Sequence, residues 1–216
     1  MERLVTVGKT RLDGSIKVQG SKNGALPILA AAYAARGESV IHNCPYLSDT
    51  VCAAKILSSL GCKAFRQGDT VVIDSRGAQG CSISECAMHE MRSSIIFLGA
   101  LLSRHSYAEI SMPGGCPIGL RPIDLHISSL EKMGMACSDC SGRLICSANG
   151  ALHGADIDLA LPSVGATENI MLAASTAKGT TVIRNAAREP EIADLARYLN
   201  SCGAKIYGAG GRAILI

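Results

Sequence analysis

The stretch GESVIHN, residues 37–43, decides the fold, because it returns 142 positions later as GTTVIRN at residues 179–185. A second pair keeps the same offset, since SSLGCK at 58–63 returns as NSCGAK at 200–205. A fainter middle copy consists of SYAEISM at 106–112 and EKMGMA at 131–136. A period of about 70 residues therefore indicates three related structural units.

Each unit is predicted to contain the same elements in the same order. A first helix is apolar nearly all round and belongs in a core; the candidates span residues 26–35, 93–103 and 168–177. A β-like segment follows, and then a half-exposed second helix at residues 49–60, 122–133 and 190–202. Short strands close the units at residues 70–75, 143–148 and 212–216. A solenoid is one interpretation, but buried first helices favour a closed α/β domain of pseudo-threefold symmetry, with helices inside and sheets outside.

Glycines mark the predicted ends of the second helices. Gly61, Gly134 and Gly203 follow the last helical residues, and glycine is favoured there because it tolerates the left-handed conformation. Pro122 and Pro190 lie at the other end of their helices, where a first-turn proline is favoured. These signals fix the helix boundaries independently of the repeat.

The composition excludes several classes of protein. Hydrophobic residues make up 48% of the 216 positions, and the net charge of +3 is a weak signal for nucleic acid. The longest apolar run, IIFLGALL at 95–102, is too short to cross a bilayer. The N-terminus has no apolar stretch typical of a signal peptide. We therefore expect a cytoplasmic protein that binds neither nucleic acid nor membrane.

The ten cysteines lack the spacing of a disulfide framework. We expect reduced thiols, as is usual in a cytoplasm. Cys137 and Cys140 form a CxxC pair, which without a second pair is a weak signal for a metal or redox site.

Cys116 stands apart, because it lies in the loop MPGGCPIGLRP at residues 112–122. The middle unit has 24 residues between Ile110 and Gly134, whereas the corresponding spans of the other units have 20. The four extra residues fall in this loop, and loops on rigid scaffolds are where function concentrates. The alternative for Cys116 is a small buried hydrophobe.

Aligning the units also brings the starts of the first helices together, as SKNG at 21–24, EMRS at 90–93 and SVGA at 163–166. Related units are expected to point these helices in similar directions. Each start offers free backbone N–H groups and partial positive charge, which suit an anion. Lys22, Arg92 and Arg121 add full charges, and arginine suits phosphate or carboxylate. The alternative is that they are solvated charges at helix ends.

Four motifs resemble one family. They are GSKNGALPILAAA at 20–32, PGGCPIGLRPIDLHI at 113–127, PSVGATENIMLAA at 162–174 and NAAREPEI at 185–192. Together they are similar to the UDP-N-acetylglucosamine 1-carboxyvinyltransferases of the enolpyruvyl transferase family. The resemblance covers essentially the whole chain. It implies two similar domains, each an inside-out α/β barrel of three βαβαββ units, with the active site between them.

The resemblance also implies an activity. The enolpyruvyl group of phosphoenolpyruvate moves to the 3-hydroxyl of UDP-N-acetylglucosamine and phosphate is released, which opens peptidoglycan synthesis and so serves cell-wall biogenesis, cell shape and division. No metal or organic cofactor is implied. Cys116 matches the catalytic loop cysteine, usually assigned as proton donor and alkylated by fosfomycin. Lys22, Asn23 and Arg121 match the phosphoenolpyruvate site. The nucleotide-sugar site is matched by Arg92, Arg121, Pro122, Ile123, Asp124, Leu125, Ser163, Val164 and Gly165.

Other positions are open or depart from the family pattern. His126, one turn after Pro122, either lines the cleft or is a structural helix residue. Leu161 stands where some family members place a lysine near the nucleotide sugar, which puts contacts there in doubt.

The length is the main departure, because family members are about twice as long. We expect residues 22–216 to form the first large domain, with repeats at roughly 22–80, 81–150 and 151–216. Residues 1–21 would lie with the second, missing domain. A fragment of this kind is expected to be inactive alone. The alternatives are a non-catalytic module that holds a nucleotide sugar, and an enzyme like enolpyruvylshikimate phosphate synthase, although the latter is not expected to carry the cysteine loop.

Overall fold

The structure is a computed structural model that describes residues 5, 7–9, 11, 13–112 and 123–216, without the side chain of Arg92. The first third contains α1 (Lys22–Ala34), β1 (Glu38–Ile41), α2 (Ser48–Ser59), β2 (Lys63–Gln67) and β3 (Thr70–Asp74). The middle third contains β4 (Ser82–Ile83), α3 (Glu85–Glu90), the 3-10 helix η1 (Arg92–Ile96), α4 (Phe97–His105), β5 (Tyr107–Ser111), α5 (Asp124–Lys132), β6 (Met135–Cys140) and β7 (Arg143–Ala148). The last third contains β8 (Asp156–Asp158), α6 (Val164–Ala174), β9 (Val182–Arg184), α7 (Pro190–Ser201) and β10 (Ala213–Leu215).

Each third of the chain builds its own small sheet, with strand orders β1-β3-β2, β4-β5-β7-β6 and β10-β9-β8. Most neighbouring strands are antiparallel, but β4 with β5 and β8 with β9 are parallel. These two parallel strands precede the first helices of their units. The predicted α/β fold of three related units is confirmed, whereas α3 and the strands β2, β4, β6 and β8 were not predicted.

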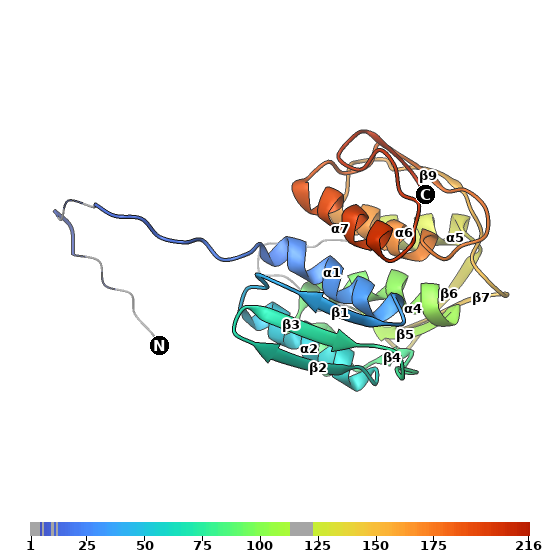
Figure 1. Ribbon diagram of the computed structural model, residues 1–216. Coiled ribbons are helices and arrows are strands. Elements are labelled where there is room, and N and C mark those ends of the chain that lie inside the picture. The colour runs from blue at the N-terminus through green and yellow to red at the C-terminus, as the bar shows by residue number, and fades with distance from the viewer. Residues whose placement is uncertain (1–4, 6, 10, 12, 113–122) are drawn as a thin grey trace.

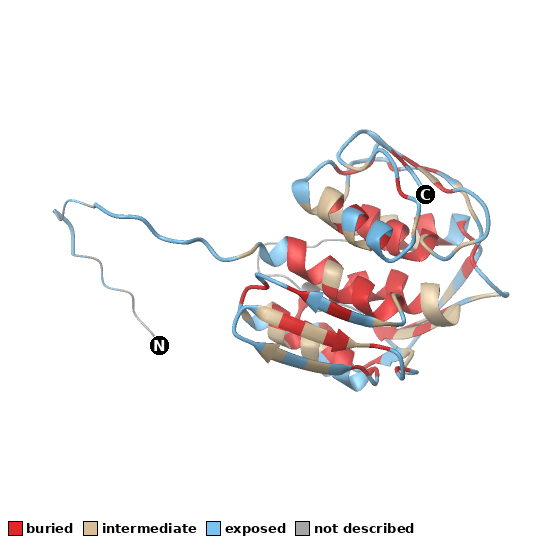
Figure 2. Cartoon of the chain, viewed as in Figure 1, coloured by how far each residue is buried: buried red, intermediate tan, exposed pale blue. Residues whose placement is uncertain are grey.

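The first helices form the interior, as their composition predicts. In Figures 1 and 2, α1 and α4 lie at the centre of the molecule and are buried along most of their length. Side chains that are fully inaccessible include Leu29 and Tyr33 of α1, Leu98 and Leu101 of α4, and Ile170 of α6. Small residues such as Ala30 and Ala173, also fully buried, let these helices approach closely.

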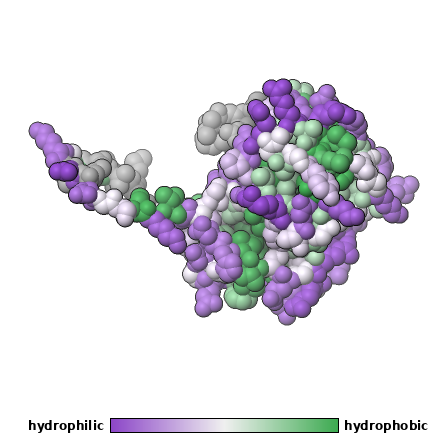
Figure 3. Space-filling view, turned by 45° about the horizontal axis from the view of Figure 1, so that its top comes forward, coloured by the Kyte–Doolittle hydropathy of each residue, from purple (hydrophilic) through white to green (hydrophobic). Residues whose placement is uncertain are grey.

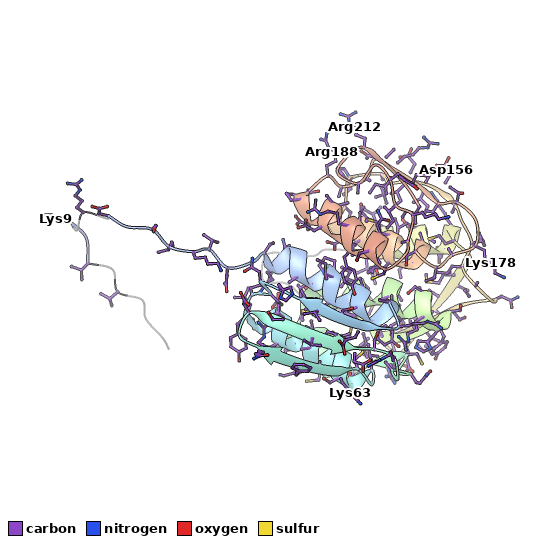
Figure 4. All side chains as sticks on the ribbon, viewed as in Figure 1. Lys9, Lys63, Asp156, Lys178, Arg188 and Arg212 are labelled. Atoms are coloured by element: carbon purple, nitrogen blue, oxygen red, sulfur yellow. A yellow bond between two sulfur atoms is a disulfide. The ribbon has the colours of Figure 1, made fainter. Side chains whose placement is uncertain are left out.

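The second helices α2, α5 and α7 begin and end within two residues of the predicted bounds. Gly61, Gly134 and Gly203 have φ of 93°, 93° and 102°, so each takes the left-handed conformation that follows a helix. Pro190 is the first residue of α7. Pro122 lies outside the described residues. Exposed charged side chains such as Lys63, Asp156 and Lys178 point away from the inner helices (Figure 4).

The described residues before α1 extend away from the rest of the molecule (Figure 1). Their larger apolar side chains alternate within two short stretches, Val5 with Val7 and Ile16 with Val18, and are 77–90% exposed. Hydrophobic surface is visible on this segment in Figure 3. Alternation of this kind is typical of a β-strand with one covered face, yet no strand pairs with this segment in the described structure.

Cys137 and Cys146 form a disulfide between β6 and β7. The two residues face each other in the strand register, with Cα atoms 4.2 Å apart. The expectation that every cysteine is a reduced thiol is therefore wrong for this pair, because strand pairing brings the two sulfurs together. Cys140 is exposed and opposite Arg143, so the CxxC residues are not joined to each other. None of the helices in the described part of the chain has the length and apolar character needed to cross a membrane.

Candidate active site

The inner helices α4 and α6 run side by side in the same direction. The side chain of Asn169, in the middle of α6, donates to the Ile95 carbonyl just before α4 at 3.0 Å and accepts from the Gly99 N–H in the first turn of α4 at 2.7 Å. Beyond the last residue of α6, Thr176 donates to the carbonyl of Ser103 at 2.9 Å. Later residues of α6 therefore contact later residues of α4. The two helices run in the same direction, and their starts lie at the same end.

Helix α1 shares this direction. Arg104, near the end of α4, donates to the Tyr33 carbonyl near the end of α1 at 2.7 Å. The hydroxyl of Tyr33 also lies 2.6 Å from Nε2 of His105. Because the ends of α1 and α4 meet here, and α1 also packs against η1 and α6, the starts of all three gather at the opposite end. This confirms the predicted common direction of the first helices.

Lys22 and Asn23 are the first two residues of α1 and are exposed. The helix begins there because Ser21 caps it, accepting from the Gly24 N–H at 3.2 Å. Lys22 Nζ lies 2.8 Å from Oδ2 of Asp49, in the first turn of α2, and the lysine side chain is 46% exposed. Such an exposed ion pair contributes little to stability, so an incoming anion can compete for the ammonium group.

The predicted segments at the starts of α5 and α6 are neighbours. Ile123 precedes α5, Asp124 is its exposed first residue and Leu125 is half-buried. Ser163 caps α6 by accepting from the Ala166 N–H at 3.3 Å, and Val164 and Gly165 form its first turn. A Cβ atom on Gly165 would lie 3.0 Å from Cε1 of His126. Glycine thus lets α5 and α6 approach closely without displacing the His126 ring.

The remaining predicted residues are only partly described. Arg92 is the first residue of η1, so its backbone lies at the start of the middle inner helix. Cys116, Arg121 and Pro122 lie outside the described residues. In the described part of the chain, no group of three or more His, Cys, Asp or Glu side chains could hold a metal ion.

Sequence reasoning missed a buried carboxyl within the inner helix α6. Glu168 of α6 is 6% exposed. Its pKa is raised to about 8, mainly by desolvation and in addition by the negative charges of Glu191 and Glu189 at the start of α7. A glutamate inside an apolar helix could have drawn attention, because glutamate is rarely fully buried without a partner.

Asn169 was missed as well, although it is fully buried and bonded to three elements. Besides Ile95 and Gly99, its Nδ2 lies 2.7 Å from Nδ1 of His126 on α5. His126 is buried, and desolvation lowers its pKa to about 4, opposed by the charge of Asp124. The ring is therefore neutral at pH 7.

Comparison with known proteins places this arrangement in a family. Residues 6–216 match the family described as EPSP synthase (3-phosphoshikimate 1-carboxyvinyltransferase). The chain belongs to this family. Among solved structures, the enolpyruvyl transferase NikO from Streptomyces tendae has a TM-score of 0.84 at 23% identity, covering 97% of this chain and 49% of that one. An EPSP synthase from Acinetobacter baumannii has a TM-score of 0.72 at 19% identity, covering 94% of this chain and 46% of that one.

Relatives in sequence are much more similar. The UDP-N-acetylglucosamine 1-carboxyvinyltransferase 2 of Caldanaerobacter subterraneus subsp. tengcongensis is 51% identical over 97% of this chain and 50% of its own length. UDP-N-acetylglucosamine 1-carboxyvinyltransferase 1 of Symbiobacterium thermophilum is 49% identical over 97% of this chain and 48% of its own. The Yersinia pestis enzyme is 45% identical over 100% of this chain and 51% of its own. This family member thus spans about half the length of these relatives.

Proposed function

We propose that this chain is the N-terminal half of a UDP-N-acetylglucosamine 1-carboxyvinyltransferase. The observation that carries the proposal is its 45–51% identity, over nearly its whole length, to proteins of that name. The whole enzyme would move the enolpyruvyl group of phosphoenolpyruvate to the 3-hydroxyl of UDP-N-acetylglucosamine. Phosphate is the second product.

Both proposed substrates are anions, and the gathered helix starts suit them. We assign phosphoenolpyruvate to Lys22, Asn23 and Arg121. We assign the nucleotide sugar to Arg92, the segment 121–125 and the segment 163–165. Support comes from the common direction of α1, α4 and α6, whose free N–H groups and partial positive charges favour anions at one end. Release of Lys22 from Asp49 would add a full positive charge to that end.

The chemistry requires a proton donor and a base. The 3-hydroxyl oxygen bonds to the central carbon of phosphoenolpyruvate while a proton goes to the methylene carbon. The methyl group so formed then loses a proton, the bond to the phosphate oxygen breaks, and phosphate leaves as the double bond returns. We assign the first proton to the thiol of Cys116, which makes this thiol the proposed fosfomycin target. No metal or cofactor takes part in these steps.

The second half of the enzyme is the proposed partner. It would supply the carboxylate that deprotonates the sugar hydroxyl, together with further arginines. We propose that residues 22–216 form one domain and that the segment before Lys22 packs on the other. This proposal is supported by two exposed pairs of alternating apolar side chains, Val5 with Val7 and Ile16 with Val18, as expected of short strands that lack their sheet.

Two other functions have some support. The family description favours a shikimate-type enzyme, but identity to the Acinetobacter baumannii EPSP synthase is 19%, against 45–51% for the nucleotide-sugar enzymes. The half length favours a non-catalytic binding module. We prefer the transferase because the catalytic cysteine loop is present in the sequence. Roles in peptidoglycan synthesis, cell-wall biogenesis, cell shape and cell division follow from the proposed activity. A cytoplasmic location, where phosphoenolpyruvate is made, is proposed with it.

Calorimetric titration with UDP-N-acetylglucosamine tests the assigned site. We expect weak binding to this chain, because a ligand between two domains loses about half of its contacts when one wall is missing. Arg121→Ala is expected to weaken binding about tenfold or more, since it removes a charge-assisted hydrogen bond. Arg212→Ala, an exposed arginine of the third unit (Figure 4), should leave binding unchanged. Tight binding that survives Arg121→Ala would contradict the assignment.

A further inference from the structure

Asn169, in the middle of α6, is a fully buried side chain with three hydrogen-bonding partners. Its carbonyl oxygen accepts from the Gly99 N–H at 2.7 Å, and its amide nitrogen donates to the Ile95 carbonyl at 3.0 Å. Backbone N–H and C=O groups cannot exchange roles. The orientation of the amide is therefore dictated by two backbone groups, one acceptor and one donor.

This orientation fixes the proton on His126. The second hydrogen of the Asn169 amide nitrogen faces Nδ1 of His126, 2.7 Å away. An amide nitrogen can only donate, so Nδ1 must be the acceptor and carry no proton. Because burial also keeps the ring neutral, the single ring proton lies on Nε2. Asp124 is the charged group that acts against this by favouring the imidazolium ion.

The protonated edge of the ring lies against the start of α6. A Cβ atom on Gly165 would be 3.4 Å from Nε2 of His126. Gly165 belongs to the segment assigned to the nucleotide sugar, and its helix start favours anions. In the described part of the chain Nε2 makes no hydrogen bond with a protein group, so its N–H is a donor without a protein acceptor there.

Resting on the proposed function, we propose that Asn169 is a positioning residue of the nucleotide-sugar site. It holds His126 in the tautomer whose Nε2–H donates to an anionic oxygen of the bound nucleotide sugar at the first turn of α6. The same side chain ties η1, α4 and α5 to α6, so the donor and the helix starts move as one body. His126 contacts the ligand in this account, and Asn169 acts through it.

The decisive experiment is ¹⁵N nuclear magnetic resonance of the chain with labelled histidine, in which the two ring nitrogens of each tautomer are distinct. The chain has five histidines, and the signals lost in a His126→Gln variant assign this ring. We expect a protonated Nε2 and a bare Nδ1 in the parent. Asn169→Asp replaces the donor with an acceptor and should move the proton to Nδ1 or charge the ring. A parent ring protonated on Nδ1, or an unchanged tautomer in Asn169→Asp, would overturn the proposal.

Asn200→Asp is a matched control, because Asn200 makes the same pair of bonds with the backbone of Ile206 at 2.8 and 2.9 Å and contacts no histidine. This variant measures how much a new carboxylate at such a position destabilises the fold, and it should leave the tautomer of His126 unchanged. If Asn169→Asp does not fold, Asn169→Ser removes the amide without a charge and should give a mixture of tautomers. A pure Nε2–H ring in Asn169→Ser would overturn the proposal equally.

Addition of UDP-N-acetylglucosamine separates this proposal from the proposed function. In the parent we expect the Nε2 signal to shift together with the backbone amides of residues 163–165, and in Asn169→Asp we expect the dissociation constant to rise about tenfold. Amide shifts without a change at Nε2 would overturn the positioning role alone. The absence of any shift at millimolar ligand would overturn the assigned nucleotide-sugar site, and the positioning role with it.

Discussion

At the scale of single residues, the buried carboxyl of Glu168 makes stability depend on pH. Its pKa is near 8 in the folded chain and near 4.3 when unfolded. The folded state therefore binds the proton more tightly, and the stabilisation is fully present below pH 4.3 and is lost as the pH rises through 8. We expect the free energy of unfolding to fall by a few kcal/mol across that window.

Chemical unfolding of the parent and of Glu168→Gln between pH 5 and 8 measures this effect. The variant cannot ionise at this position, so its stability should lack that part of the loss. The difference between the two curves isolates Glu168 from other groups, such as His126, whose lowered pKa acts in the opposite direction. Parallel pH profiles for the two proteins would show that Glu168 is not the group responsible.

The thiol of Cys116 carries a second prediction at this scale. In the full-length protein we expect fosfomycin to alkylate Cys116 before any other cysteine, because nearby cations lower a thiol pKa and favour the thiolate. The described thiols include poor competitors, since burial raises the pKa of Cys52 and of Cys62 to about 11. Peptide mass spectrometry would locate the adduct. Preferential labelling of another cysteine, or undiminished labelling of a Cys116→Asp variant, would refute the assignment.

At the scale of elements, the disulfide between β6 and β7 is expected to stabilise the middle sheet modestly. The chain-entropy account of a loop closed across nine residues gives at most about 3 kcal/mol, and the six paired positions of the two strands already restrict that loop. Urea unfolding with and without reductant should show the loss. Cys137→Ser should abolish the difference, and Cys140→Ser should keep it. Equal stability of the parent under both conditions would contradict this prediction.

The individual elements also show how much of the fold could be predicted from the sequence. The apolar first helices were predictable because burial demands apolar residues. The ends of the second helices were predictable because a left-handed φ favours glycine, as at Gly61 and Gly203. The disulfide was not, because β6 was not predicted and register depends on both strands. The hydrogen bonds of Asn169 were not predictable either, because the sequence of an apolar helix does not indicate which groups of η1, α4 and α5 its amide will contact.

The candidate site was predictable to a similar extent. The helix starts at Lys22 and Ser163 follow from capping residues and repeat spacing, and the structure brings these helices together at one end. The pairing of Lys22 with Asp49 depends on how α1 packs against α2, which no local pattern encodes. The roles of Cys116 and Arg121 remain predictions from the resemblance, since both residues lie outside the described part of the structure.

At the scale of the whole molecule, three units bury their own first helices, so this chain is expected to fold without its partner. The proposed base and much of the phosphoenolpyruvate site lie elsewhere, and loss of such groups costs orders of magnitude in rate. The uncovered apolar residues before α1 favour the proposed packing against a second half, and the chain spans about half the length of the three named relatives.

The most direct test is a phosphate-release assay on this chain alone and on a chimera that joins it to the C-terminal half of the Caldanaerobacter subterraneus relative. We expect no release by the 216-residue chain, and release by the chimera that requires both phosphoenolpyruvate and UDP-N-acetylglucosamine. Lys22→Ala should abolish it, whereas Lys63→Ala, at an exposed position on β2, should not. Turnover by the chain alone, an inactive but folded chimera, or a chimera that accepts shikimate 3-phosphate instead would contradict the account.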